Sequence, residues 1–291
     1  MNLDGGSKPP RPDTSFASGS AVPDHLPAPG AVEDIVRRVA REEILPRFTE
    51  VQHHVKHDGS LVTEADHATQ HRLQVEFRQR WPQFDFLGEE MPAHEHERLI
   101  AGDRSLWCVD PLDGTSNFAT GIPFFAVSVA LLQHGRSALA VVYDPVRDEC
   151  FSARPGQGAW LNGARLGTAV APPDRPLRRA IACIDLKRLD RALAMRLVTE
   201  PPFGSQRNFG ASSLEWCWLA DGRFHIYLHG GQKLWDYAAA SVILAEAGGH
   251  ARTLDGEPVF RADLAPRSVV AGMDETLYRA WCAWLGVSPA H

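Results

Sequence analysis

One stretch decides how this chain is interpreted: Trp107-Cys-Val-Asp110-Pro-Leu-Asp113-Gly-Thr115-Ser-Asn-Phe118. An apolar run ends on two acids three residues apart, and a glycine and two hydroxyl side chains follow them. Pro111 biases the residues before it toward extended geometry, and Gly114 permits the sharp turn that lets Asp113 and the Leu112 carbonyl converge on Asp110. Such hard oxygen ligands select Mg²⁺ or Mn²⁺ over zinc. The stretch is typical of a metal-binding loop, although an ordinary acidic turn has the same composition.

Two other parts of the chain place an acid beside an apolar segment. The run Phe84–Leu87 leads into Gly88-Glu89-Glu90, just as an apolar run leads into Asp110, and both runs are typical of strands. Asp236 opens an apolar helix predicted at 235–247, which two glycines close. An ordinary helix cap also places an acid there, so Asp236 alone does not establish a site.

Hydrophobic periodicity predicts the remaining elements. Helices are expected at 31–46, 63–80, 190–198 and 212–220, and strands at 106–109, 124–132, 138–143, 149–153, 159–161, 180–184 and 224–228. His94 and His96 fall in a stretch dense in Glu and His that is predicted to be an exposed connection. Helices, then a mixed sheet, then alternating strands and helices indicate a layered α/β or α+β enzyme.

Composition divides the chain into three parts. Residues 1–30 are rich in Pro, Gly, Ser and Asp, and we expect a disordered N-terminal tail there. A Pro-rich segment at 171–176 then separates two halves. The N-terminal α+β half, 31–175, carries most of the candidate metal ligands, and the C-terminal α/β half, 176–291, carries Asp236 and a candidate substrate loop.

Charge and hydropathy exclude several classes of protein. The chain has 291 residues, 44% of them hydrophobic, a net charge of -6 and five cysteines without a C-x-x-C pair. A net negative charge argues against direct nucleic-acid binding, which requires a basic surface. The apolar runs are too short to span a membrane, and no signal peptide is apparent. We therefore expect a cytoplasmic protein without a membrane partner.

Four segments together resemble the signatures of a known family. They are Leu61–Asp66, Gly88–Glu90, Asp110–Thr115 and Trp235–Ala239, the last followed by Glu246–Gly249. In this order and spacing they resemble the inositol monophosphatase family, part of the lithium-sensitive, magnesium-dependent phosphatase superfamily. The resemblance implies a layered αβαβα sandwich of the inositol monophosphatase and fructose-1,6-bisphosphatase type, with the site between its two halves.

The resemblance also implies a role for each acid. Glu89, Asp110 and the Leu112 carbonyl would bind one Mg²⁺ ion, and Asp110, Asp113 and Asp236 a second; Glu89 would share a third through waters. Asp66 and Thr115 match the pair that positions and deprotonates the attacking water, which makes Asp66, Thr115 and Glu89 the expected catalytic residues. Two or three Mg²⁺ ions are expected in each site, and Mn²⁺ could replace them.

The expected substrate contacts come from three segments. Gly114, Thr115 and Ser116 would offer amides and hydroxyls to the phosphate. The second substrate loop of the family corresponds to Gly210, Ala211 and Ser212, although Ser212 is equally suited to an ordinary helix cap. His229 stands where inositol phosphatases carry an acid that grips ring hydroxyls, and imidazole does not offer the same pair of acceptors.

The predicted function is therefore a phosphoric monoester hydrolase. A metal-activated water would hydrolyse a small phosphorylated metabolite, such as an inositol phosphate or another polyol or sugar phosphate. Histidinol-phosphate phosphatase, fructose-1,6-bisphosphatase and 3'(2'),5'-bisphosphate nucleotidase activities remain alternatives, because relatives with these activities share the metal motifs. A regulatory partner in a transcription complex is an alternative of another class, and the resemblance also implies a homodimer.

Overall fold

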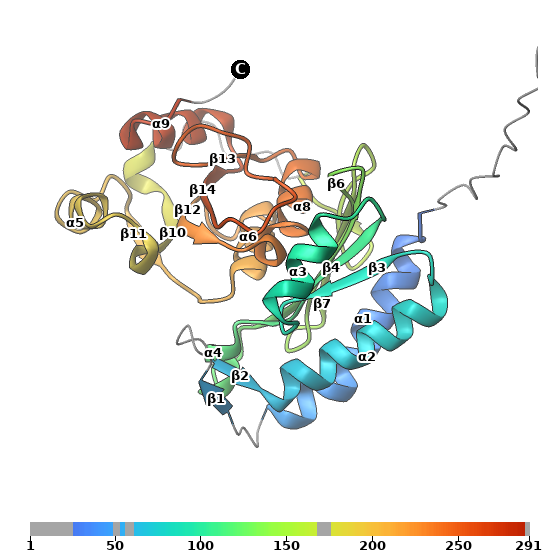
Figure 1. Cartoon of the computed structure of the whole chain (residues 1–291). Coiled ribbons are helices and arrows are strands. Elements are labelled where there is room, and N and C mark those ends of the chain that lie inside the picture. Colours follow the sequence, from blue (N-terminus) through green and yellow to red (C-terminus); the bar gives the residue numbers. More distant parts are fainter. Residues whose placement is uncertain (1–25, 49–52, 56–60, 168–175, 289–291) are drawn as a thin grey trace, which may run out of the picture.

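Two large β-sheets alternate with three layers of helices in the computed structural model, which describes residues 26–48, 53–55, 61–167 and 176–288 (Figure 1). The layers enclose three separate hydrophobic cores. One core lies on each face of the larger sheet, and the third lies on the outer face of the smaller sheet. The αβαβα sandwich implied by the resemblance is confirmed. Residues 1–25, most of the predicted tail, lie outside the described residues.

The larger sheet contains the strands of the N-terminal half. Its order is β3-β4-β5-β6-β7-β8-β9, and every neighbouring pair is antiparallel except β3 with β4. The bounds are β3 (Asp85–Gly88), β4 (Leu106–Asp113), β5 (Ala126–Gln133), β6 (Arg136–Asp144), β7 (Glu149–Arg154), β8 (Gly158–Leu161) and β9 (Ala164–Arg165). The predicted meander is present, and short hairpins connect most of its strands.

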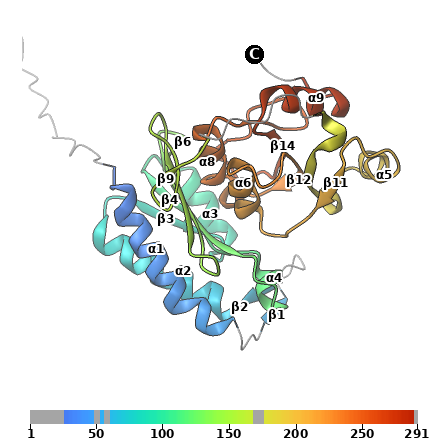
Figure 2. The same ribbon diagram turned by 180° about the vertical axis from the view of Figure 1, so that it is seen from behind.

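Helices α1 (Pro29–Glu43) and α2 (Glu64–Arg80) cover the outer face of this sheet (Figures 1 and 2). The predicted apolar stripe of α1 is buried against the sheet, from Val32 to Ala40. The short η1 turn (Leu45–Arg47) ends this helical region, and the β1–β2 hairpin (His53–Val55 with Leu61–Thr63) precedes α2.

The smaller sheet has the order β11-β10-β12-β14-β13. Its bounds are β10 (Ile181–Asp185), β11 (Ser205–Arg207), β12 (Ile226–Gln232), β13 (His250–Arg252) and β14 (Arg267–Gly272). Strand β10 is parallel to both of its neighbours, whereas the other pairs are antiparallel. The turns η2 (Leu177–Arg179) and η3 (Leu186–Arg188) flank β10, and α5 (Arg191–Thr199) and α9 (Glu275–Leu285) lie on the outer side.

The middle layer lies between the sheets and carries residues of the site. It contains α6 (Ser212–Ala220), α7 (Leu234–Tyr237) and α8 (Ala240–Glu246). Their apolar faces share one core with the larger sheet and with β12 and β14. Two further helices, α3 (Ala93–Ile100) and α4 (Thr115–Ala119), connect the strands near the site.

Two sequence predictions need correction. The helix expected at 235–247 is interrupted after Tyr237, where the buried Ser137 hydroxyl donates to the Ala238 carbonyl at 2.8 Å. This bond draws the carbonyl toward β6 and away from the helical ladder. The expected exposed connection at His94 and His96 is instead the helix α3, in which His96 is only 7% exposed.

Four helices and strands of the C-terminal half, β11, β13, β14 and α9, were not predicted, although residues of α9 repeat at helical spacing. Leu277, Tyr278, Trp281 and Cys282 form its buried stripe.

All five cysteines are buried and unpaired. Among the described helices, none combines the length and the apolar character needed to cross a bilayer.

Candidate metal centre and substrate pocket

Strand β4 carries two acids whose spacing would normally separate them. Residues three apart on a regular strand point to opposite faces of the sheet. Asp110 pairs with Ser128 and Asp113 with Ala126, so three steps along β4 match only two along β5. This bulge adds one residue to β4 and reverses the alternation, which brings both carboxylates to the same side.

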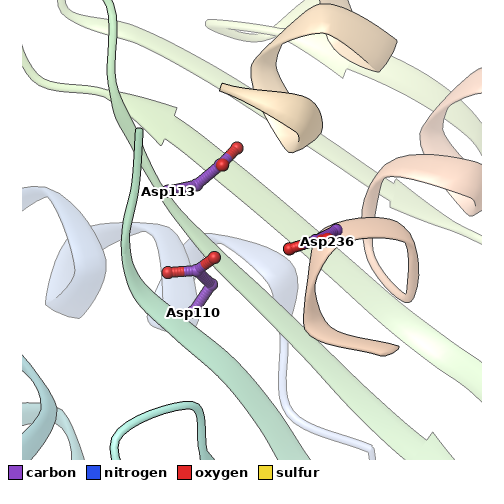
Figure 3. Close-up of side chains that lie close together, drawn as sticks. All are labelled: Asp110, Asp113 and Asp236. Atoms are coloured by element: carbon purple, nitrogen blue, oxygen red, sulfur yellow. The ribbon is translucent and has the colours of Figure 1, made fainter. Parts of the chain in front are cut away.

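Asp236 approaches these two carboxylates from the other half of the molecule (Figure 3). Oxygen atoms of Asp110, Asp113 and Asp236 all lie within 4.8 Å of one another. Asp236 is fixed at the start of α7, where the Lys233 backbone amide donates to its Oδ2 at 2.8 Å. The Ser128 hydroxyl donates to the Trp235 carbonyl at 3.1 Å and ties the same turn to β5.

The Asp113 carboxylate also connects the two halves. The backbone amides of Ser212 and Ser213 donate to it at 3.1 and 2.6 Å, and the Ser213 hydroxyl donates at 2.6 Å. These amides belong to the first turn of α6, whose positive end favours a negative charge. An acid predicted as a metal ligand therefore also caps a helix of the middle layer.

Burial and mutual repulsion make this cluster unfavourable for free carboxylates. Burial raises the pKa of Asp110 well above its usual value, and the charges of Glu89, Asp113 and Asp236 add to that rise. Burial likewise raises the pKa of Asp236, with Asp113 and Glu89 contributing. Burial raises the pKa of Asp113 to about 6 against the opposing hydrogen bonds from Ser213. A divalent cation relieves this repulsion, and a set of carboxylate oxygens suits Mg²⁺. The residues present therefore fit the implied metal.

Glu89 lines the same pocket but is not one of the three clustered carboxylates. Its backbone amide donates to the Val109 carbonyl at 3.0 Å, which aligns the end of β3 with the end of β4. The Leu112 carbonyl is held nearby, because the Leu112 amide donates to Asp110 at 3.0 Å. All five expected metal ligands therefore line the same pocket.

Asp66 and Thr115 form the expected pair. The Thr115 hydroxyl lies 3.0 Å from Asp66 Oδ1 and 3.0 Å from the Leu112 carbonyl, and both oxygens are acceptors. The Thr63 amide and hydroxyl donate to Asp66 Oδ2 at 2.7 and 2.6 Å, so the Thr63 hydroxyl is a donor to the acid. Burial raises the pKa of Asp66 in spite of these bonds. Asp66 is 1% exposed and reaches the pocket through Thr115, which lines it.

The predicted phosphate contacts lie at the start of α4. Gly114, Thr115 and Ser116 all line the pocket. Gly114 has φ 91°, and a Cβ atom there would lie 3.0 Å from both the Phe124 carbonyl and the Ala211 side chain. Glycine is therefore required by the backbone conformation and by the close approach of the second substrate loop.

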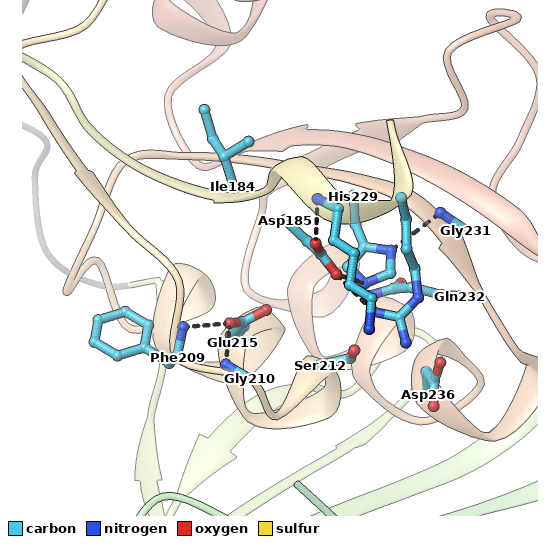
Figure 4. A network of polar contacts seen from close by, with 12 residues as sticks. Ile184, Asp185, Phe209, Gly210, Ser212, Glu215, His229, Gly231, Gln232 and Asp236 are labelled. Carbon is cyan, nitrogen blue, oxygen red and sulfur yellow. Dashed lines mark hydrogen bonds and ion pairs between the residues drawn. The ribbon is translucent and has the colours of Figure 1, made fainter. Parts of the chain in front are cut away.

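That second loop is organised by a buried acid. Glu215 accepts from the Phe209 and Gly210 amides at 2.8 and 2.9 Å (Figure 4). It also accepts from the Tyr227 hydroxyl at 2.9 Å. Gly210 and Ser212 line the pocket, whereas Ala211 is fully buried behind Gly114. Ser212 is the first residue of α6, and Ala211 occupies the cap position.

His229 lines the pocket as predicted, together with two residues that sequence reasoning missed, Asp185 and Arg188. Asp185 Oδ2 lies 3.2 Å from His229 Nε2 and accepts from Arg188 Nη1 at 2.6 Å. The signal for Asp185 was available, because the strand predicted at 180–184 ends on this acid as other strands end on Glu89 and Asp110. Asn208, also missed, lines the pocket on the loop before Gly210.

Comparisons with known proteins agree with this geometry. The sequence model of the inositol monophosphatase family matches residues 30–284. An inositol-1-monophosphatase from Mesorhizobium japonicum is 35% identical over 242 residues, which are 80% of this chain and 86% of the relative. The Nus factor SuhB of Pseudomonas aeruginosa is 36% identical over 219 residues, 72% of this chain and 78% of the relative. The crystal structure of the suhB protein from Bartonella henselae superposes with a TM-score of 0.72 at 28% identity, covering 86% of this chain and 98% of that one.

Proposed function

The chain belongs to the inositol monophosphatase family, and on that premise we propose that it is a Mg²⁺-dependent phosphatase that hydrolyses a small phosphate monoester. One observation carries the proposal: three carboxylates within 4.8 Å of one another share a pocket with the Thr115 hydroxyl that is bonded to Asp66. An adaptor protein does not require this combination.

The acids of the pocket would hold the metal. Asp110, Asp113 and Asp236 form its main carboxylate set, and Glu89 and the Leu112 carbonyl extend that set along the pocket wall. When bound, Mg²⁺ would lower the pKa of a bound water and neutralise negative charge on the phosphoryl group. Two or three ions, with Mn²⁺ as a substitute, are part of the proposal.

Asp66 and Thr115 would control the attacking water. The Thr115 oxygen can accept a hydrogen bond from that water while its own proton is directed to Asp66 Oδ1, 3.0 Å away. Burial raises the pKa of Asp66, which favours proton uptake by this acid. Glu89, the third expected catalytic residue, adds negative charge near Asp66 and contributes to that rise. No covalent intermediate is needed, because water attacks phosphorus directly.

Gly114, Thr115 and Ser116 would bind the phosphate, and Gly210, Ser212 and His229 would face the alcohol that leaves. An inositol-phosphate-like or other polyol or sugar phosphate is the first substrate class, since a relative 35% identical is named inositol-1-monophosphatase. Histidinol phosphate, fructose 1,6-bisphosphate and a 3'(2'),5'-bisphosphate nucleotide remain alternatives.

A second candidate function is a regulatory role in a transcription complex. Relatives named Nus factor SuhB favour it, and the one from Pseudomonas aeruginosa is 36% identical. Such a role need not exclude catalysis, and it leaves direct contact with nucleic acid open. A homodimer in the cytoplasm remains part of the prediction.

The test is phosphate release from the full chain with Mg²⁺ or with chelator. The substrates are inositol phosphate, glycerol phosphate, histidinol phosphate, fructose 1,6-bisphosphate and phosphoadenosine phosphate. We expect Mg²⁺-dependent release from at least one of them and none from Asp110→Asn, with the circular dichroism of that variant unchanged. Equal release by Asp110→Asn, or release that persists in chelator, would overturn the proposal.

A further inference from the structure

The pocket contains one fixed cation opposite its acids. Of the described residues that line the pocket, Arg188 alone is a lysine or an arginine. It also lies close enough to Asp236 for its charge to oppose the rise in the pKa of that acid. A basic group at this position is unexpected in a pocket that also contains the three clustered carboxylates proposed to bind metal.

Arg188 is held in place by Asp185. The turn η3 begins after Asp185, whose Oδ1 accepts from the Lys187 amide at 2.9 Å and whose Oδ2 accepts from Arg188 Nη1 at 2.6 Å. Burial opposes the ionisation of Asp185, but the hydrogen bond to His229 and the ion pair with Arg188 outweigh it and hold its pKa well below the usual value. The carboxylate is therefore a stable anchor for the guanidinium.

His229 supports this anchor from the neighbouring strand. It pairs with Asp185 across β10 and β12 and is 2% exposed. The Gly231 amide donates to Nδ1 at 3.1 Å, so Nδ1 is unprotonated and the proton of the neutral ring is on Nε2, directed at Asp185 (Figure 4). Both ring nitrogens are thus engaged within the protein, and His229 supports the position of Asp185.

The backbone is also adapted to Arg188. A bulge interrupts the pairing of β12 with β14 between His229 and Gln232. Within it, a Cβ atom on Gly230 would lie 1.8 Å from the Arg188 carbonyl oxygen, so the turn η3 packs directly on a glycine. An anchored acid, a buried histidine and a glycine contact together fix the backbone and the side chain of Arg188.

The guanidinium retains donors for a ligand. Within the described part of the chain, its hydrogen bond is the one from Nη1 to Asp185, and the Arg188 side chain is 54% exposed. Guanidinium carries several N–H donors in a planar fork that matches carboxylate and phosphate oxygens, and it cannot accept a hydrogen bond from a hydroxyl. A neutral polyol leaving group would therefore interact with Arg188 less favourably than an anionic one.

We propose that Arg188 is a specificity-determining residue that binds a second anionic group, a phosphate or a carboxylate, on the alcohol side of the substrate. This inference rests on the proposed phosphatase function and narrows its substrate class. The pocket acids and their metal would bind the reacting phosphoryl group, and Arg188 would bind the second anionic group.

The test compares substrates that differ in this second anion. Fructose 1,6-bisphosphate is paired with fructose 1-phosphate, and 2-phosphoglycerate with glycerol 2-phosphate, which separates the phosphate source from the carboxylate source. We expect the full chain with Mg²⁺ to favour the doubly anionic member of at least one pair in kcat/KM. Arg188→Gln should reduce that preference about 10- to 100-fold, as the loss of a charged hydrogen bond predicts.

Lys187→Gln is the matched control, because Lys187 lies in the same turn, does not line the pocket and carries the same charge. It should keep the wild-type preference. An unchanged preference in Arg188→Gln, or no preference in the wild type, overturns the role of Arg188 while leaving the phosphatase proposal intact. If no substrate is hydrolysed, the phosphatase proposal fails. Calorimetric binding of fructose 1,6-bisphosphate to the wild type and to Arg188→Gln then decides the anion site, and equal affinities overturn it.

Discussion

The imidazole of His96 packs against the indole of Trp235, with 5.1 Å between the ring centroids. Its Nε2 lies 2.8 Å from the Gly88 carbonyl, and because a carbonyl only accepts, Nε2 carries the proton. Gly88 precedes Glu89 and Trp235 precedes Asp236, so one buried ring contacts the neighbours of two proposed metal ligands in the two halves of the chain.

We expect His96→Ala to weaken Mg²⁺ binding roughly tenfold, because groups that orient metal ligands commonly have effects of that size. His94→Ala is the control, since the His94 side chain two residues away is 77% exposed. Calorimetry with Mg²⁺ and the Mg²⁺ dependence of thermal unfolding both report the change. Equal Mg²⁺ affinities in the two variants would show that the ring does not position the ligands.

Thr115→Val should lower kcat by about 10²- to 10⁴-fold, the usual contribution of a positioned proton-transfer group. The variant keeps the shape of the side chain but removes the hydroxyl that lies 3.0 Å from Asp66. Thr115→Ser keeps the hydroxyl and should retain most of the activity. Phosphate release at saturating substrate and Mg²⁺ distinguishes them, and a valine variant within a few-fold of wild type would remove Thr115 from the mechanism.

The acid cluster predicts an unusual dependence of stability on pH. The pKa of Asp113 is raised to about 6 by burial, and those of Asp110 and Asp236 are raised further above their usual value. The folded state therefore binds more protons than the unfolded state, whose carboxyl groups have pKa values near about 4. For these groups, the free energy of unfolding falls as pH rises from about 4 through the folded pKa values.

We expect urea unfolding in chelator to show this loss from about pH 4 to pH 6 for Asp113, on the order of 1 kcal/mol for each unit of pKa shift crossed. Mg²⁺ at pH 7 should restore stability, because it binds the ionised cluster in the folded state only. The same slope with and without Mg²⁺ would contradict the assignment of the cluster as the metal site.

Gly230→Ala should destabilise the protein by roughly 1–3 kcal/mol, because the added methyl group would collide with the Arg188 carbonyl. Gly231→Ala is a matched control, since the nearest atom to its Cβ would be Pro266 Cβ at an ordinary 3.6 Å. Denaturant unfolding measures both variants. A Gly230→Ala protein as stable as Gly231→Ala would show that η3 can move away from β12.

Much of the metal centre could be predicted from the sequence, because an acid that directly follows an apolar, strand-like run can be recognised without a structure. Glu89 and Asp110 follow that rule, whereas Asp236 is marked by its place at the start of an apolar helix. The convergence of Asp113 with Asp110 depends on a bulge between β4 and β5, which spacing alone does not reveal. Asp185 obeys the same strand-end rule but was overlooked, because no motif marked it.

The remaining residues could not be predicted because their roles depend on contacts between distant segments. His96 was placed in an exposed connection on composition, whereas its burial arises from packing of α3 against Trp235. Arg188 appears in the sequence as one basic residue among many, and only the pairing of β10 with β12 brings it to the pocket. Local periodicity was sufficient for α1 but carries no information about such neighbours.

The bulge in β4 makes this site sensitive to the number of residues as well as to their identity. Asp113 reaches the same face as Asp110 because β4 has one more residue between the two acids than β5 has between their partners. Deletion of Leu112 would restore regular pairing and leave the two acids two residues apart, on one face. It would also remove the Leu112 carbonyl and the turn before Gly114. Across descendants of this gene, insertions and deletions between the two acids should therefore be eliminated as strictly as substitutions of the acids themselves.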